Sequence, residues 1–314
     1  MGSGGGAMSA RDGLDVGCGS EPEGSIPNVE TNELRYPMLY LYRRHATDSG
    51  GAGKFRGGVG IELAFKPHGV KSIPNFVLHC HGIDGPNGPG QDGGYPHTCN
   101  EIVIVRRSGV PRSLKAGILP QTLDEMGGHR KTPTPFGHTF LNQVDVFHSI
   151  SSGGGGWGDP LERDSSLVIQ DIEEGLMTEH WARELYGVVL NAAGVIDLEQ
   201  TTQHRQTLRR RRRDWSLNFS DNPRPEYAAI WQSHLLNTPN SGSGACLKCG
   251  GDLRALSVCQ VPWEVAGPYY RALASQKGFR LLAWSCPTCN ALLLVKPFYD
   301  VENGRSGRIS SNMR

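Results

Sequence analysis

The sequence predicts an α+β protein, in which a β-rich region is followed by short helices and a small metal-binding ribbon. Before residue 150, short apolar segments recur between turns rich in glycine and proline, a pattern typical of strands. Helical spacing with capping residues starts near residue 164, and two CxxC pairs lie near the end of the chain. We therefore expect a first domain over 1–200, an arginine-rich linker and helix over 201–244, a zinc-ribbon-like domain over 245–305 and a tail over 306–314.

Composition limits the classes of function. The 314 residues carry 32 basic and 31 acidic side chains, so the whole chain has no strong electrostatic attraction to nucleic acid or membrane. There is no run of about 18 apolar residues that would predict a membrane span. The first residues lack the apolar core of a signal peptide, and the sequence predicts a cytoplasmic protein.

The strand candidates come first in chain order. Pro37 interrupts the first, which predicts an edge strand or two short strands, because proline cannot donate to a ladder. The segment 115–139 is rich in threonine, proline and glycine and is expected to be loop and turn. The predicted strands cover 33–42, 60–65, 75–80, 101–106 and 145–150.

Two glycine-rich stretches, 48–60 and 151–164, cannot be ordinary helix or strand interiors, because glycine loses too much chain entropy there. They indicate backbone packed closely against a partner chain, a ligand or the chain itself. A plain surface loop is an equally good interpretation of glycine content alone.

The segment 79–99 is a long loop that holds three histidines, and loops of this length are often functional. His79, His81 and His97 are candidates for a metal site or for acid–base chemistry. The simpler interpretation is that they pack or hydrogen-bond in the structure.

Helical features follow. Asp164 and Thr178 are predicted N-caps of two helices that end at Gly175 and Gly187, and 188–190 is expected to be a short strand. Five arginines in a row, 209–213, could bind RNA, DNA or an acidic partner, but a solvated helix end or linker is favoured. An amphipathic helix over 223–237 and a linker over 238–244 complete this part.

The two CxxC pairs are the strongest chemical signal. Each pair places two thiolates on one side of a tight turn, and two such turns complete a tetrahedral site of four sulfurs. Such a site has no open position for water, so we expect structural zinc; iron uses similar ligands, and a dithiol redox centre is the rival. The intervening 36 residues leave room for an insert over 262–278. The predicted ligands are Cys246, Cys249, Cys286 and Cys289.

Several motifs resemble a known family. DSGGAGKFRGGVG, GGGGWGDPLERD and LYGVVL, in that order, together with SGGGAMSARDGLDVG, resemble the C-terminal half of hydantoinase B proteins over roughly residues 4–197. That family includes subunits of N-methylhydantoinase, 5-oxoprolinase, and acetone and acetophenone carboxylases. The GGYP element followed by Cys-Asn is closer to the ketone carboxylases. The cysteine-rich tail is similar to the small zinc-containing subunit of acetone carboxylases.

The resemblance implies a subunit of a multi-subunit, ATP-dependent ketone carboxylase that converts acetone or acetophenone and bicarbonate to a β-keto acid. ATP would bind a hydantoinase-A-like partner, since no GxxxxGK[ST] loop occurs here. Other hydantoinase-B-like subunits would complete the hetero-oligomer. The alternatives are ATP-dependent opening of a hydantoin or 5-oxoproline ring, and a non-catalytic assembly or nucleic-acid-binding zinc-ribbon protein.

Overall fold

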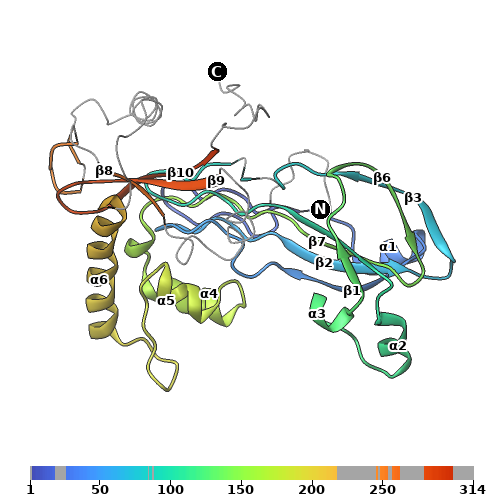
Figure 1. Cartoon of the computed structure of the whole chain (residues 1–314). Helices are drawn as coiled ribbons and strands as arrows, with labels where there is room; N and C mark the ends of the chain where they lie inside the picture. Colours follow the sequence, from blue (N-terminus) through green and yellow to red (C-terminus); the bar gives the residue numbers. More distant parts are fainter. Residues whose placement is uncertain are drawn as a thin grey trace.

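The computed structural model describes residues 2–17, 26–83, 85–86, 88–217, 245–246, 248–253, 257–261 and 279–299. Figure 1 shows an elongated molecule in which a β-rich lobe is joined by a set of extended segments to a second lobe of helices and a small sheet. The expected helix over 223–237, the linker over 238–244 and the insert over 262–278 lie outside the described residues.

A five-stranded antiparallel sheet forms the first lobe. Its register pairs Ile150 with Glu62 on one side and with Glu101 on the other, so side chains of three neighbouring strands share each face. The strand order is β1 (Met38–His45), β2 (Ile61–Pro67), β7 (Val146–Ile150), β4 (Glu101–Arg106) and β5 (His129–Lys131).

Both faces of this sheet are covered. The two-stranded ribbon of β3 (Ser72–His79) and β6 (Phe136–Asn142) packs on one face, where Phe65 and Phe147 have ring centroids 5.1 Å apart. Short helices α2 (Val110–Lys115) and α3 (Leu123–Met126) close the other face with fully buried apolar side chains. This lobe therefore has a core on each side of one sheet.

Three expectations from the sequence need correction, the first two in this lobe and the third in the second lobe. The first predicted strand, 33–42, begins in a helix: α1 (Val29–Arg35) is capped by Asn28, and the strand starts only after Pro37. The predicted loop over 115–139 contains α3, β5 and the start of β6. Since β5 is exposed and entirely polar, it lacks the alternation that reveals a strand. Residues 188–190 form no strand; Leu190 makes an isolated bridge to Ile196.

The helices of the second lobe begin where their caps predict. The Asp164 side chain accepts from Ser166 N at the start of α4 (Ser165–Glu173), and Thr178 caps α5 (Glu179–Glu184). Gly175 and Gly187, which follow them, adopt φ of +71° and +66°. The arginine run lies within one long helix, α6 (Leu198–Leu217).

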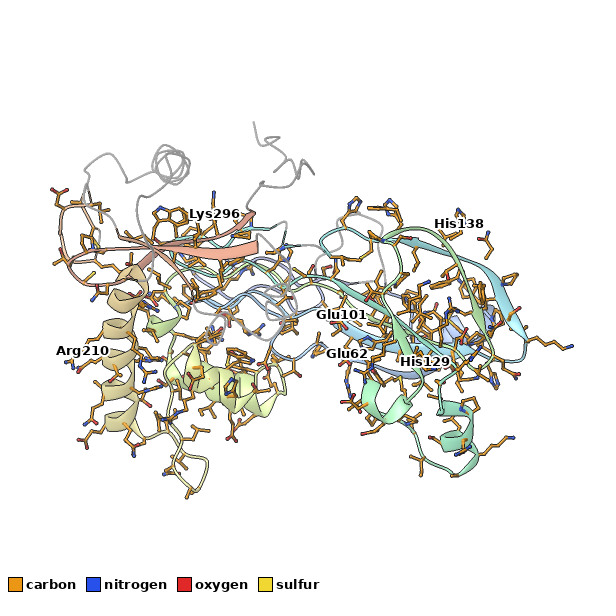
Figure 2. The ribbon with its side chains drawn as sticks, in the orientation of Figure 1. Glu62, Glu101, His129, His138, Arg210 and Lys296 are labelled. Carbon is orange, nitrogen blue, oxygen red and sulfur yellow. The ribbon has the colours of Figure 1, made fainter. Side chains whose placement is uncertain are left out.

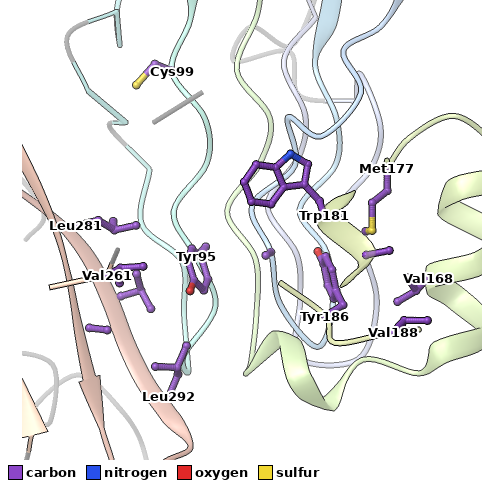
Figure 3. Packing of buried hydrophobic residues seen from close by; sticks show 14 residues of the cluster. Tyr95, Cys99, Val168, Met177, Trp181, Tyr186, Val188, Val261, Leu281 and Leu292 are labelled. Carbon is purple, nitrogen blue, oxygen red and sulfur yellow. The ribbon is translucent and has the colours of Figure 1, made fainter. Parts of the chain in front are cut away.

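A three-stranded sheet, in the order β10 (Leu292–Tyr299), β9 (Phe279–Ser285), β8 (Ser257–Gln260), shares its core with helices α4 and α5. Figure 3 shows Leu281 and Leu292 facing Tyr95, with Trp181 and Tyr186 on the far side of the extended segments. The predicted boundary near residue 244 thus separates two parts of the sequence that are packed on one cluster of buried side chains.

Candidate metal centre

Extended glycine-rich segments connect the two lobes. We call them the glycine layer; it comprises residues 2–7, 12–17, 49–60, 88–98 and 151–158. They bond one another through the backbone: Gly4 N donates to Ser152 O, Gly58 N to Gly5 O, and Gly154 N to Gly58 O, all at 2.8–3.0 Å. Of the interpretations left open by the sequence, the structure shows packing of the chain against itself.

Glycine is required here by close approach of backbone to backbone. A Cβ placed on Gly154 would lie 1.8 Å from the Gly5 carbonyl oxygen, and one on Gly58 would lie 2.0 Å from Leu14 O. No side chain fits at these distances. The segments 2–7 and 12–17 are therefore an integral part of the layer.

A buried network of charges holds the same segments. Arg163, with a side chain 1% exposed, donates to both oxygens of Asp12 and to Asp171, each bond at 2.7 Å. Arg56 bonds Asp171 at 3.1 Å and Asp15 at 2.9 Å. Burial raises the pKa of Asp171, against the opposing effect of the two guanidiniums. The network ties residues from the start of the chain to the Arg-Asp end of the second glycine-rich motif.

The four cysteines of the CxxC pairs converge at the edge of the second lobe. Their sulfur atoms all lie within 4.8 Å of one another. The Sγ atoms of Cys246 and Cys289 are 3.9 Å apart, and those of Cys249 and Cys286 are 3.7 Å apart. A tetrahedral ion with metal–sulfur bonds of about 2.3 Å places its sulfurs about 3.8 Å from each other. The cysteines are thus positioned to bind one metal ion.

The electrostatics of the group also suit a metal. Burial acts to raise the pKa of Cys286, but backbone hydrogen bonds from Cys289 and Thr288 outweigh it and lower this pKa to about 7. Burial and the thiols of Cys249 and Cys286 raise the pKa of Cys289 to about 12. The Cys286 thiol therefore ionises more readily than that of Cys289, and a bound cation would favour the thiolate form of both.

The second CxxC turn is fixed by a buried aspartate that the sequence did not reveal. Asp159 is 0% exposed and accepts from Leu292 N at 3.1 Å, at the start of β10. Arg212 of α6 bonds both carboxylate oxygens, at 2.5 and 2.8 Å, and also donates to Asn290 O at 3.3 Å. The Arg212 guanidinium outweighs burial and holds the pKa of Asp159 well below its usual range. A second contact joins Lys248, in the first CxxC turn, to Glu162 at 2.6 Å.

The arginine run is not uniformly solvated, so the favoured interpretation of the sequence needs correction. Arg209 donates to Leu161 O at 3.5 Å, and Arg212 is buried, whereas Arg210 is exposed (Figure 2). One turn earlier, Arg205 donates to Tyr186 O and to Arg163 O. Because positions four and seven apart share a helix face, one side of α6 binds the second glycine-rich motif while the other faces water.

The structure brings two of the three candidate histidines together. The rings of His79 and His81 are 5.1 Å apart and both pack edge-on against Phe136. His97 is buried: its Nε2 accepts from Gly88 N at 2.6 Å, so Nδ1 carries the proton and donates to Thr98 O at 2.5 Å. Burial lowers the pKa of His97, which keeps it neutral. Within the described residues, the three histidines do not form a group of metal-ligating atoms. A catalytic or binding role for them stays a prediction.

A further charged cluster lies on the five-stranded sheet, and Figure 2 labels its central member, Glu62. Arg44 makes two hydrogen bonds to Glu62, at 2.9 and 3.2 Å, and His148 Nε2 lies 3.2 Å from Glu62. Burial raises the pKa of Glu62, but His148 and Arg44 outweigh it and hold this pKa at about 2. The cluster escaped sequence analysis because its members lie on three strands, far apart in sequence.

A small cavity of about 40 Å³ opens beside Arg212, between α5, α6 and Tyr95. This volume suits a few water molecules and is too small for a ketone together with a nucleotide. Among the described residues, no helix has the length and apolar character needed to cross a membrane.

Comparison with known proteins identifies the family. The family model described as hydantoinase B/oxoprolinase matches residues 1–160. The chain belongs to this family. The α+β fold is confirmed by the solved structure of a nucleotide-free acetone carboxylase, with a TM-score of 0.59 and 26% identity over 75% of this chain and 32% of that one.

The similar curated proteins are all longer. The acetone carboxylase alpha subunit of Xanthobacter autotrophicus is 29% identical over 60% of this chain and 26% of its own length. The acetophenone carboxylase delta subunit of Aromatoleum aromaticum is 28% identical over 74% and 37%, respectively. The caprolactamase subunit beta of Pseudomonas jessenii is 31% identical over 65% and 32%. This chain of the hydantoinase B family thus spans between about a quarter and somewhat over a third of these relatives.

Proposed function

We propose that this hydantoinase-B-family chain is a subunit of a hetero-oligomeric, ATP-dependent ketone carboxylase. The observation that supports this most is the shared fold with acetone carboxylase over 75% of the chain. Two similar curated proteins are also named as subunits of acetone and acetophenone carboxylases. The substrate class we propose is a small ketone with an acidic α-hydrogen, together with bicarbonate.

In the proposed reaction, phosphoryl transfer from ATP activates bicarbonate, the ketone or both, and the α-carbon of the ketone loses a proton. The resulting enol-type carbon forms a bond to the carbon dioxide that bicarbonate supplies and gives a β-keto acid, with one ADP and one phosphate for each phosphoryl group transferred. ATP would bind a hydantoinase-A-like partner. This chain would supply a rigid frame, through its glycine layer, and its His79–His81 pair would face substrate or partner.

The cysteine site would hold structural zinc in this assembly. Four sulfur ligands fill a tetrahedral ion and leave no position for a reacting water. Free paired thiols persist in reducing compartments, which supports a cytoplasmic location. A nucleic-acid partner is disfavoured, because Arg209 and Arg212 already bind groups of this chain.

The second candidate is ATP-dependent hydrolysis of a cyclic amide. It is favoured by the caprolactamase subunit, which at 31% is as similar in sequence as the carboxylase subunits. The two reactions consume the same nucleotide but differ in their need for bicarbonate, and this difference decides the test.

The test begins with purification of the tagged chain from its native host, followed by metal analysis. We expect hydantoinase-A-like and other B-like chains to co-purify, with about one zinc per copy. The complex should then incorporate labelled bicarbonate into acetone or acetophenone only when ATP is present. The alternative result is that the complex opens the ring of caprolactam, hydantoin or 5-oxoproline with ATP and without bicarbonate. That result would contradict carboxylation and support the second candidate. A chain that purifies alone or with nucleic acid would contradict both.

A further inference from the structure

Asp159 belongs to the Gly-Asp-Pro turn at the end of the glycine layer, and its carboxylate is saturated with donors. Leu161 N bonds it at 3.0 Å within the turn, and Leu292 N bonds it at 3.1 Å from β10. Arg212 supplies two more hydrogen bonds. An ionised carboxylate offers about four acceptor positions, so three separate parts of the chain fill all of them.

One of these parts is the second CxxC turn. Asn290 follows the predicted ligand Cys289; its N–H bonds Cys286 O at 2.9 Å, and its own carbonyl accepts from Arg212. Cys286 N bonds Ala291 O at 3.0 Å, one residue before Leu292. The turn that presents two thiols is therefore held in place by the groups that Asp159 and Arg212 contact.

Two other contacts join the same regions. A Cβ on Gly93 would lie 2.2 Å from Leu292 O, so the glycine layer touches the backbone of β10 directly. Lys248, between the two cysteines of the first turn, bonds Glu162, which is three residues after Asp159. Both CxxC turns are thus bound to the segment around 159–162.

Separation of these parts would be costly. If the second turn disordered, Asp159 would lose the Leu292 N–H and Arg212 would lose the Asn290 carbonyl, and a buried charge pair would be left under-bonded. Metal binding at the four cysteines would keep that turn ordered. By thermodynamic linkage, the two effects are equal in size. The factor by which bound metal favours the ordered Asp159 turn is the factor by which the ordered turn raises the affinity for metal.

We propose that Asp159 is a positioning residue for the metal site: with Arg212, it couples metal binding at the four cysteines to the order of residues 157–162, at the end of the glycine layer. Asp159 does not ligate the ion. Its role is to hold the second CxxC turn so that two thiolates already face the metal before it binds.

The first test measures zinc affinity of the full chain by competition with a chelator. Asp159→Asn and Arg212→Gln are expected to weaken zinc binding about 10- to 100-fold, the range usual for residues that orient metal ligands. The matched control is Arg210→Gln, on the exposed side of the same helix, which should bind zinc within about twofold of wild type. Equal affinity of wild type and both test variants would overturn the proposal.

The second test needs no substitution. Hydrogen exchange of the wild-type chain, with and without chelator, should show that metal removal exposes the amides of Leu161 and Leu292. The amide of Ile104, in the five-stranded sheet, is expected to keep its protection. Unchanged protection of Leu161 after metal loss would contradict the coupling, even if Asp159→Asn failed to fold. Neither readout depends on enzymatic activity, so the inference can fail while the proposed function stands.

Discussion

Gly154 shows how little freedom a single residue has in the glycine layer. Its neighbours are carbonyl oxygens and backbone atoms, which cannot rotate away as a side chain can. Gly6, on the segment beside it, has only Gly155 O near a would-be Cβ, at 4.0 Å. The same residue type is therefore essential at one position and replaceable at another, and the difference depends on contacts that no glycine count reveals.

This contrast gives the first prediction. Gly154→Ala should lower the free energy of unfolding by about 3 kcal/mol or more, because the methyl group must displace backbone. Gly6→Ala, the control, should change it by less than about 1 kcal/mol. Urea unfolding of both variants measures the difference, and equal stabilities would show that the layer is looser than its contacts indicate.

Arg163 illustrates a buried charge shared by two carboxylates. Arg163→Met removes the only guanidinium that bonds both Asp12 and Asp171 among the described residues, and it takes away two of the hydrogen bonds that Asp12 accepts. We expect a loss of about 3–5 kcal/mol of stability, as is usual when one member of a buried charge network is removed. Arg130→Met breaks an exposed pair with Asp124 and should cost less than about 1 kcal/mol. Denaturant unfolding of the two variants decides the matter.

Glu62 supplies a prediction about pH. Its pKa in the folded chain is about 2, below the ordinary value of 4.5, so its charge stabilises the fold above pH 4.5 and this contribution is lost as pH falls toward 2. Glu62→Gln should therefore destabilise the protein by about 1–2 kcal/mol at pH 7, after allowance for the exposed Arg44. The difference in the free energy of unfolding between wild type and Glu62→Gln should shrink to zero as the pH falls from 4.5 to 2. A gap that is constant over this range would exclude the ion pair as its source.

At the scale of elements, the segments predicted best are those with local signals. Strand β4 was predicted with its full bounds, and α4 and α5 were predicted from their caps, because alternation and capping depend on neighbouring residues. The strand β5 has no such signal, and α1 has a cap, Asn28, but buries none of its residues, so it lacks an apolar face. The inward face of α6 was missed for another reason: its partners are Asp159 and Asn290, 53 and 78 residues from Arg212.

The cap of α4 allows a direct test at this scale. Asp164 bonds both Ser166 N and Ser166 Oγ, so Asp164→Ala should cost about 1 kcal/mol. Asp164→Asn keeps a side-chain oxygen that can accept these hydrogen bonds, so it should lose only part of this stability. Thermal unfolding of the pair is the measurement, and identical melting temperatures for wild type and Asp164→Ala would contradict a capping role.

At the scale of the molecule, the convergence of the four cysteines could be predicted from CxxC spacing alone, but its relation to the rest of the chain could not. The sequence indicated a domain boundary near residue 244, whereas the structure places Leu281, Leu292 and Val295 in one buried cluster with Tyr95 and Trp181. A shift in composition shows where one segment of the sequence ends and another begins. Only the packing of side chains shows whether the two segments share a core. The same limit applied to the glycine layer, where close backbone contact was foreseen but not its partner.

The shared core predicts the effect of truncation. A chain ending at residue 244 would expose the side chains that Leu281 and Leu292 cover, so it should bind the dye ANS strongly and melt at a lower temperature. A full-length variant with Cys→Ser at the four predicted ligands is the companion sample, since it keeps the apolar sheet. Normal melting of the truncated chain would instead support two independent domains.

The hydrogen bonds of the glycine layer run from each segment to neighbours on more than one side: Gly154 N bonds Gly58 O, Gly51 N bonds Gly154 O, and Gly156 N bonds Tyr95 O. An ordinary sheet bonds only within its own plane, so it bends and shears easily across that plane. The glycine layer is hydrogen-bonded in several directions, so it should resist bending and shear in each of them. In this protein it joins the five-stranded sheet to the lobe that carries the cysteine site, and we expect it to hold the two at a constant separation.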